Sequence, residues 1–342
     1  MNNIYYVDEK IPTTHKISDE TTFLSYANYW MEDCKNDLSE KTYRRYLSLL
    51  ERINYGIGHI ALKNIAPYHI KEFLKKLGQD GVNKRNGKKL SKKTILHHYR
   101  LISVILQQAV REQIIKYNPT SKDYMKPPKA PKTTIRCLQL QDVQKILAGL
   151  TGEQIKWQVI TKILLFTGIR RGELCGLEWQ DIDFDNKIIS IMRSSLYTVE
   201  KGIYTKEPKT KSSTRIFSVS DKVLAIFYEY KEWYKETYGY VSDCDLASKR
   251  LFITRDKKPM HPDSINDWMT KFYIKNDIVK FTPHILRHTY ISLLISKGVS
   301  IKEISERVGH SNLSTTCNIY AHSIKVADLI ASSSLDDIID EF

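Results

Sequence analysis

The sequence predicts a mainly α-helical protein with a small antiparallel β-sheet, divided into two domains. Its length of 342 residues fits two domains but not many more. From Thr22 onward, apolar residues recur at helical spacing, whereas only the short segments 187–192 and 215–219 alternate in the way strands do. A stretch rich in proline and lysine, residues 118–136, separates the two helical regions and is expected to be a semi-rigid linker.

The first region, residues 22–117, is expected to be an all-helical domain that follows an N-terminal tail, residues 1–21. Its first helix begins after Thr22, where Phe23, Tyr26, Ala27 and Trp30 share one face. Further helices are expected after the N-cap residue Ser39, over 67–77 and over 91–116.

The second region, residues 137–322, is expected to combine helices with the two strands, and residues 323–342 form a C-terminal tail. Gly168 ends one of these helices, as glycine often does at a helix C-terminus. The last eight residues are acidic and amphipathic, which suggests docking on a neighbouring copy of the chain. The helices of this region are expected at 141–150, 154–166, 222–237, 264–275, 283–296 and 301–308.

The formal net charge of +14 favours a polyanionic partner, because lysine and arginine neutralise phosphates and release counterions. Most of this excess lies before Arg136. The basic segment 83–93 contains the turn dipeptide Asn86–Gly87 and leads into a helix. Charged segments of this kind are often only solvated surface, but the side chains expected to contact phosphates are Lys84, Arg85, Lys88, Lys89, Lys92, Lys93 and Arg100.

Membrane and metal partners are not expected from the sequence. No apolar stretch approaches the roughly 18 residues of a membrane span, and the N-terminus does not have the pattern of a signal peptide. Asp181, Asp183 and Asp185 imitate the start of a calcium loop, but Asn186 and Met192 stand where glycine and glutamate are needed. Five scattered cysteines without a CxxC pattern fit a reducing cytosol. We therefore expect a cytoplasmic, nucleoid-associated protein without metal or cofactor.

The segment from Thr282 to Tyr320 brings together side chains suited to a phosphodiester. His284 and Arg287 lie three residues apart, at the start of a helix whose free backbone N–H groups attract anions. His310 follows the helix-ending Gly309, and Tyr320 supplies a phenol. Taken singly, each of these residues has an ordinary structural explanation.

Another arginine, Arg170, is expected in a turn between two helices. Glu173 follows three residues later, where its carboxylate can hold a guanidinium. A plain surface ion pair is the alternative interpretation.

The order and spacing of five motifs closely resemble the tyrosine recombinase family, also called the phage integrase family. These motifs are TGIRRGEL, EPKTKSSTR, HILRHT, VGH and the final tyrosine, Tyr320. The resemblance covers residues 138–322 and, more weakly, the helical region 22–117. It implies a core-DNA-binding domain and a catalytic domain that close around duplex DNA like a C-clamp.

The same resemblance implies a role for each site residue. Arg170 and Arg287 would bind the non-bridging oxygens of the scissile phosphate, and His310 would add a hydrogen bond. Tyr320 would attack phosphorus to form a 3′-phosphotyrosine, while His284 accepts or steers the phenol proton. Lys209 would protonate the leaving 5′ oxygen, with Lys211 as the second choice. In the remaining expected roles, Glu173 and His288 support the site, and Lys211 and Arg215 contact DNA.

The implied function is site-specific recombination by a tetramer on two double-stranded DNA sites, through a Holliday junction. We favour the integrase of a prophage or integrative conjugative element, assisted by a directionality factor or a host DNA-bending protein. The alternatives are a chromosome-dimer resolvase, a type IB topoisomerase and a DNA-binding regulator without catalytic activity. Only about twenty residues precede Thr22, too few for a folded arm-binding domain without metal or disulfides, so such a domain is either lacking or removed.

Overall fold

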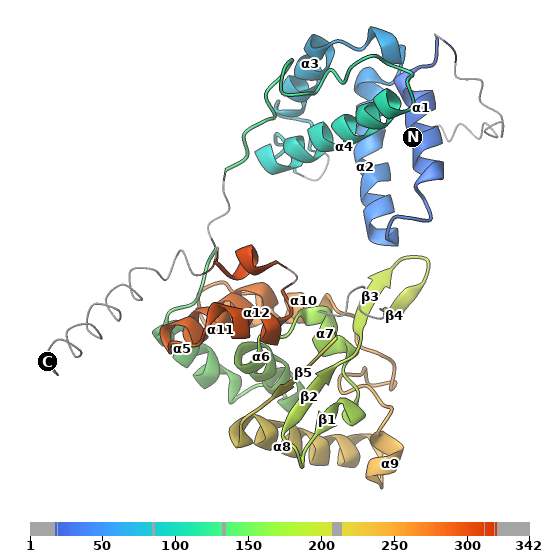
Figure 1. Cartoon of the computed structure of the whole chain (residues 1–342). Coiled ribbons are helices and arrows are strands. Elements are labelled where there is room, and N and C mark those ends of the chain that lie inside the picture. The colour runs from blue at the N-terminus through green and yellow to red at the C-terminus, as the bar shows by residue number, and fades with distance from the viewer. Residues whose placement is uncertain are drawn as a thin grey trace, which may run out of the picture. The chain divides into compact units, whose positions relative to one another are not determined.

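The chain forms two compact units, residues Met1–Thr133 (unit one) and Thr134–Phe342 (unit two) (Figure 1). The structure is a computed structural model. It describes Ser18 and residues 20–83, 86–131, 135–206, 214–310, 312–317 and 319. Each unit has its own hydrophobic core.

Unit one is a bundle of helices, as the apolar spacing predicts. The side chains of Thr22, Ser39 and Ser91 accept hydrogen bonds from backbone N–H groups in the first turns of three helices, which begin where the sequence predicts. The apolar faces meet in a core around Phe23, Ile53 and others. The elements are α1 (Phe23–Asp33), α2 (Glu40–Ile57), the 3₁₀ turn η1 (Leu62–Asn64), α3 (Pro67–Leu77) and α4 (Lys92–Arg111).

The end of unit one differs from the sequence prediction in two respects. Helix α4 ends at Arg111 rather than near Lys116, because Gln113 takes a left-handed conformation with φ of 61°. The predicted linker also begins too early. Thr120 and Met125 are buried in unit one, and the Tyr99 hydroxyl donates a hydrogen bond to the Thr120 carbonyl. The first part of the segment 118–136 therefore belongs to the helical unit.

Unit two is a helical body with two small antiparallel sheets, and the predicted fold class is confirmed. One sheet has the strand order β1-β2-β5 and the other pairs β3 with β4. The strands are β1 (Ile182–Asp183), β2 (Ile188–Ile191), β3 (Ser194–Thr198), β4 (Gly202–Lys206) and β5 (Arg215–Ser218). The helices are α5 (Leu140–Leu150), α6 (Ile155–Thr167), α7 (Arg171–Gly176), the 3₁₀ turn η2 (Trp179–Asp181), α8 (Asp221–Tyr238), α9 (Asp243–Leu246), α10 (Ser264–Lys275), α11 (Pro283–Ser296) and α12 (Ile301–Val308).

The sequence analysis missed the short elements of unit two. The β3–β4 hairpin has strands of five residues, and helices α7 and α9 have six and four, too short for a period to be recognised. Helix α7 lies directly against β3. A Cβ atom on Gly172 would come 2.5 Å from the Ser194 hydroxyl oxygen, and one on Gly176 would come 2.8 Å from the Arg193 carbonyl oxygen.

Helix α6 is the central helix of unit two. It is apolar on most sides, with Val159, Ile160, Ile163, Leu164 and Leu165 all buried, as expected for a helix covered by others. Helix α11 lies beside it, and α12 packs against α11 (Figure 1). Helix α6 ends at Gly168, which has φ of 63°. Within the part of the chain that the structure describes, no helix is long and apolar enough to cross a membrane.

Candidate active site

Arg170 stands at the junction of α6 and α7, as the N-cap residue of α7. Its Nη1 atom lies 2.8 Å from Oε1 of Glu173, and its backbone N–H donates to Oε2 of the same carboxylate, also at 2.8 Å. Its Nη2 atom donates to the carbonyl of Gly309. The side chain keeps 37% of its surface exposed. Arg170 is therefore held from behind while part of its guanidinium faces solvent.

Arg287 lies on α11, one turn after the N-cap residue Thr282, whose hydroxyl accepts from the N–H of Ile285. Its side chain is buried, and its two terminal nitrogens donate to the carbonyls of Gly168 and Val308 at 2.6 Å each. Desolvation, followed by the charge of Arg170, lowers the pKa of Arg287 to about 9. A buried cation bound to neutral carbonyls stabilises an anion that reaches it.

Arg215 is placed differently from the sequence prediction, which put it on the DNA. It is buried at the start of β5, and its terminal nitrogens donate to Glu173 at 3.1 and 2.7 Å. Burial alone would raise the pKa of Glu173, but the hydrogen bonds and charge of Arg215, then the charge of Arg170, lower it to about 2. A guanidinium enclosed in this way is not available to a DNA strand, so we revise the prediction for Arg215.

His310 follows α12 and lies beside these arginines. Desolvation, then the guanidiniums of Arg287 and Arg170, lowers its pKa to about 3, so the ring is neutral near pH 7. Its Nδ1 atom is 2.8 Å from the hydroxyl of the buried Thr316. This contact orients the ring and leaves Nε2 as the polar atom for a ligand.

The other two site histidines, His284 and His288, both lie on α11 and differ in exposure. The His284 ring is exposed on the first turn, yet desolvation by its surroundings and then the charges of Arg287, Arg171 and Arg170 lower its pKa. His288 is half-buried, and its pKa is lowered to about 4, first by desolvation. Both rings are therefore neutral near pH 7.

Three of the predicted site residues in unit two, Lys209, Lys211 and Tyr320, lie outside the described residues. The described neighbours on either side of them are well anchored. Arg215 is tied to Glu173, and Ile319 is fully buried against a small cluster that includes Tyr290 and Ile291 of α11.

The match with known proteins agrees with this geometry. Residues 136–326 match the model of the phage integrase family, and residues 22–78 match the model described as the N-terminal SAM-like domain of phage integrases. The chain belongs to the phage integrase family. It is a tyrosine-type site-specific recombinase.

Two of the similar curated proteins are a tyrosine recombinase-like protein and an integrase. A tyrosine recombinase XerC-like protein of Caldanaerobacter subterraneus subsp. tengcongensis is 28% identical over 314 residues, covering 87% of this chain and 76% of the relative. The ICEBs1 integrase of Bacillus subtilis is 25% identical over 326 residues, covering 94% and 84%. Among solved structures, the Tn1549 transposon integrase in complex with a circular intermediate DNA has a TM-score of 0.72 at 24% identity, covering 87% of this chain and 94% of that one.

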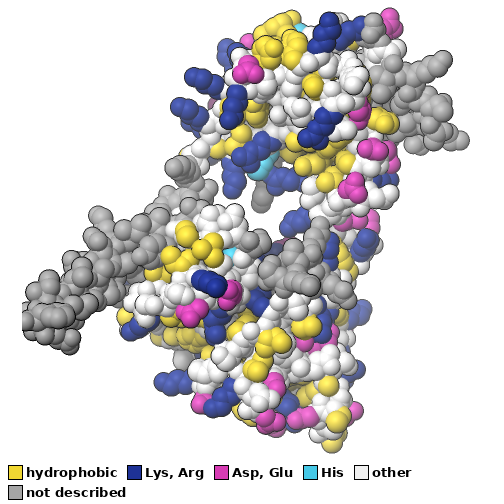
Figure 2. Space-filling model, in the orientation of Figure 1, with side chains coloured by type: hydrophobic (Ala, Val, Ile, Leu, Met, Phe, Trp, Pro, Cys, Tyr) yellow, Lys and Arg dark blue, Asp and Glu magenta, His cyan; other side chains and the backbone are white. Residues whose placement is uncertain are grey.

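The basic residues predicted on unit one of this recombinase are exposed where they are described. Gly87 takes φ of 67° in the turn of the basic segment, and its N–H donates to the Asn83 carbonyl. On the face shown in Figure 2, dark blue side chains gather along one side of unit one, where acidic side chains are sparse. Lys84 and Arg85 lie outside the described residues. The exposed residues, together called the basic edge, are Lys88, Lys89, Lys92, Lys93 and Arg100.

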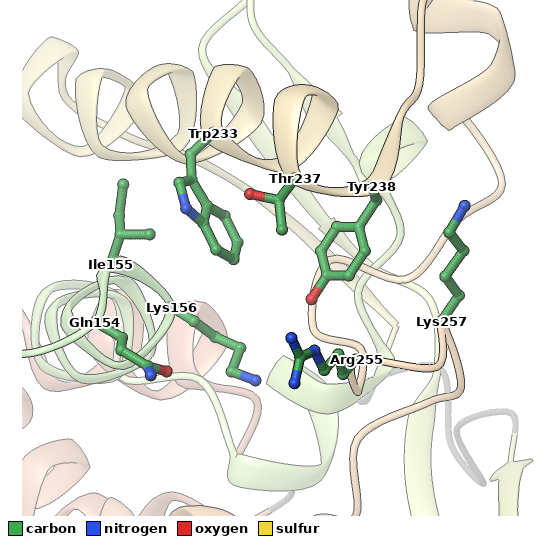
Figure 3. Close-up of a pocket in the computed structure, with 8 residues that line it drawn as sticks. All are labelled: Gln154, Ile155, Lys156, Trp233, Thr237, Tyr238, Arg255 and Lys257. Carbon is green, nitrogen blue, oxygen red and sulfur yellow. The ribbon is translucent and has the colours of Figure 1, made fainter.

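A hollow of about 890 Å³ lies in unit two, and neither Arg170, Arg215 nor Arg287 lines it. Figure 3 shows Lys156 of α6 and Arg255 reaching into it, across from Trp233 and Tyr238 of α8. It lies at the N-terminal end of α6, whereas Arg170 follows the C-terminal end, about 20 Å along the helix. This hollow is therefore separate from the site formed by Arg170, Arg287 and His310.

Two of the three aspartates of the calcium-like segment accept hydrogen bonds within the fold. Asp181 accepts from Arg193 at 2.6 Å and from the N–H of Glu178, while Asp183 accepts from the backbone N–H groups of Asp185 and Asn186. Within the described ranges, no cluster of side chains has the composition of a metal site.

The sequence analysis did not find the carbonyls of Gly168, Val308 and Gly309, or the hydroxyl of Thr316. Backbone carbonyls carry no residue signature, and a Thr–His contact six residues apart in an irregular segment follows no period. The glycines at the ends of α6 and α12 were the available signal, because they mark where helix carbonyls become free.

Proposed function

We propose that this chain cuts and rejoins double-stranded DNA at specific sites through a 3′-phosphotyrosine intermediate, with Arg170, Arg287 and His310 binding the scissile phosphate. The observation that carries the proposal is Arg287, a buried guanidinium bonded to two carbonyls beside a second, half-exposed guanidinium. Among the described residues, Glu173 forms salt bridges with Arg170 and Arg215, and no salt bridge is found for Arg287. A phosphodiester supplies the missing negative charge.

The chemistry follows from this charge arrangement. The hydroxyl oxygen of Tyr320 attacks phosphorus, a new O–P bond forms, and the bond from phosphorus to the 5′ oxygen breaks. The phenol loses its proton toward His284, and Lys209 gives a proton to the leaving 5′ oxygen. Negative charge grows on the non-bridging oxygens, where fixed guanidiniums stabilise it. The covalent bond conserves the energy of the phosphodiester, so a 5′-hydroxyl from a second duplex reverses the attack.

Tyr320 as nucleophile is supported by its neighbours in the chain. Ile319 is packed against α11, the helix that carries Arg287, and Thr316 contacts His310. A phenol has a pKa near 10 and is a weak nucleophile at neutral pH, which explains the need for an acceptor and for strong electrostatic stabilisation.

The biological setting that we propose is integration and excision of a mobile element by a tetramer. The ICEBs1 integrase and the Tn1549 integrase are integrases of mobile elements by name, and the second was solved with a circular intermediate DNA. A directionality factor or a host DNA-bending protein would set the direction. A chromosome-dimer resolvase is the second candidate, favoured by the XerC-like relative.

A nicked suicide substrate tests the chemistry. Cleavage within a few nucleotides of the nick releases a short fragment that cannot religate, so the covalent adduct accumulates and is visible on a denaturing gel. We expect an adduct with the wild-type protein and none with Tyr320→Phe, while both bind the DNA equally in a gel shift. An adduct of normal yield with Tyr320→Phe would rule out this nucleophile. No adduct with either protein would favour a DNA-binding regulator.

A second assay tests the proposed biological setting. It uses plasmids that carry the two ends of the mobile element in which this recombinase is encoded. Formation of the excised circle supports the integrase. Resolution of plasmid dimers without any element end would favour the resolvase, and relaxation of any supercoiled plasmid would favour a topoisomerase.

A further inference from the structure

We infer that Arg215 is a positioning residue for DNA cleavage, which fixes Arg170 and the end of α12 without touching DNA. This inference rests on the proposed function, because it concerns the step in which Arg170 meets the phosphate. The evidence is a set of hydrogen bonds that connect β5, α7 and α12 through the one side chain of Arg215.

Arg215 shares the carboxylate of Glu173 with Arg170. Oxygen Oε1 accepts from Nη1 of Arg170 at 2.8 Å and from Nη1 of Arg215 at 3.1 Å. Oxygen Oε2 accepts from the backbone N–H of Arg170 at 2.8 Å and from Nη2 of Arg215 at 2.7 Å. Arg215 therefore fixes the plane of the carboxylate on which both the backbone and the side chain of Arg170 depend.

Arg215 also joins a series of three consecutive carbonyls at the C-terminal end of α12. The Arg307 carbonyl accepts from Nε of Arg215 at 2.8 Å, and the next two, of Val308 and Gly309, accept from Arg287 and Arg170. These carbonyls lack partners within the helix and carry the negative end of its dipole. One helix end thus sets the relative positions of the three guanidiniums.

Gly309 gives Arg215 the room for this arrangement. The glycine has φ of 70°, and a Cβ atom there would lie 2.9 Å from Nη1 of Arg215 and 3.2 Å from its Cδ and Cζ. The guanidinium therefore packs directly on the backbone turn that precedes His310. A displacement of Arg215 would release Glu173, the end of α12 and the start of the His310 segment together.

Only arginine has the geometry for these contacts. Its planar group donates in fixed, divergent directions, here to two carboxylate oxygens and a carbonyl, whereas the ammonium of lysine is a single point charge on a flexible stem. Lysine at position 215 would keep the charge near Glu173 and lose the link to α12. Glutamine would lose both.

The test compares Arg215→Gln and Arg215→Lys with the wild type in single-turnover formation of the adduct on the nicked substrate, at saturating protein. We expect Arg215→Gln to slow adduct formation by about a hundredfold, as a small misplacement of a catalytic group does, and Arg215→Lys by about tenfold. Affinity for DNA in the gel shift should stay within about twofold. The melting temperature of each variant is measured first, and Arg215→Lys serves if Arg215→Gln does not fold.

Arg193→Gln is the matched control. Arg193 is also a largely buried arginine of unit two, paired with Asp181 at 2.6 Å and Glu178 at 3.0 Å, but it does not contact Glu173 or α12. It should lower the melting temperature and leave the rate of adduct formation unchanged. If Arg193→Gln slows the reaction as much as Arg215→Gln does, a general loss of stability explains the effect and the inference is wrong.

A double-mutant cycle with Glu173→Gln separates positioning from other effects. If Arg215 acts partly through Glu173, the two losses overlap, and Arg215→Gln costs only about tenfold, the share of its link to α12, when added to Glu173→Gln. Losses that multiply in full would overturn the inference. So would Arg215 variants that cleave at the wild-type rate when saturated but bind DNA more weakly, because that pattern belongs to a DNA contact. Failure of the wild-type protein to form the adduct at all would instead refute the proposed function.

Discussion

The buried arginines of unit two and the basic edge of unit one are both positively charged, but they are built in opposite ways. Arg287 and Arg215 are buried, all three arginines are bonded to backbone carbonyls, and Arg170 and Arg215 share the carboxylate of Glu173. The lysines of the basic edge are exposed to water. Charge in water is screened and attracts DNA without a fixed geometry, whereas charge held in a dry site stabilises one particular arrangement of negative charge.

The two regions should therefore fail differently when they are changed. Changes at the buried site should affect the rate of the chemical step, and changes at the basic edge should affect affinity and its salt dependence. The following predictions test this contrast, in order of decreasing expected effect.

Replacing Arg287 should have the largest effect. Arg287→Gln removes a buried charge that faces the phosphate, so adduct formation should slow by about 100- to 1000-fold. Stability should not fall in proportion, because desolvation already disfavours this cation in the folded state. Single-turnover kinetics and thermal melting measure the two quantities. A large fall in melting temperature with a normal rate of adduct formation would show that Arg287 stabilises the fold and does not bind the phosphate.

Gly168→Ala tests how far the buried site depends on backbone geometry. Gly168 has φ of 63°, and a Cβ atom there would come 2.4 Å from Cδ1 of Tyr290. Conformational strain and overpacking together should cost about 2–4 kcal/mol of unfolding free energy, measured in urea.

Gly87→Ala, in the turn that precedes the basic edge, is the matched control for this change. Gly87 has φ of 67°, but no atom lies within 4 Å of the added Cβ, so only the conformational cost of about 1 kcal/mol applies. Equal losses of unfolding free energy in the two variants would show that the contact with Tyr290 adds nothing to the cost of Gly168→Ala.

Changing Lys88, Lys89, Lys92 and Lys93 together to glutamine should weaken DNA binding and leave the saturated cleavage rate unchanged. For each phosphate that the protein no longer neutralises, the slope of log affinity against log salt should become shallower by about 0.9. The control is the same change at four exposed lysines of unit two, Lys222, Lys249, Lys257 and Lys258. If the slope changes equally in both quadruple variants, general charge rather than the basic edge binds the DNA.

His310→Asn should change the stability of the protein in a way that depends on pH. The folded-state pKa of His310 is about 3, against 6.5 for an ordinary histidine. Below pH 6.5 the unfolded chain binds a proton that the folded chain does not, so this position lowers stability progressively as the pH falls toward 3. The unfolding free energy of His310→Asn should therefore fall less steeply between pH 7 and pH 4.5. Parallel curves for the two proteins would contradict a buried, neutral ring.

The sequence by itself predicted the longer helices and proposed the candidate site residues. Thr22, Ser39 and Thr282 cap helices where the sequence predicts them, because a cap depends on a few neighbouring residues. The motifs around Arg170, Arg287 and His310 were found in the same way, since each is a short local pattern.

Only the tertiary structure decided what these side chains contact. Arg215 looked like one more cation in a basic insert, yet it is buried on Glu173 and on the carbonyl of Arg307. Its partners lie 42 and 92 residues away in the sequence, and a backbone carbonyl has no residue type to recognise. Arg215 and Arg287 are both buried and differ in their partners: Arg215 donates to both oxygens of Glu173, whereas Arg287 donates to two neutral carbonyls. These partners come together only when α7, α11, α12 and β5 pack.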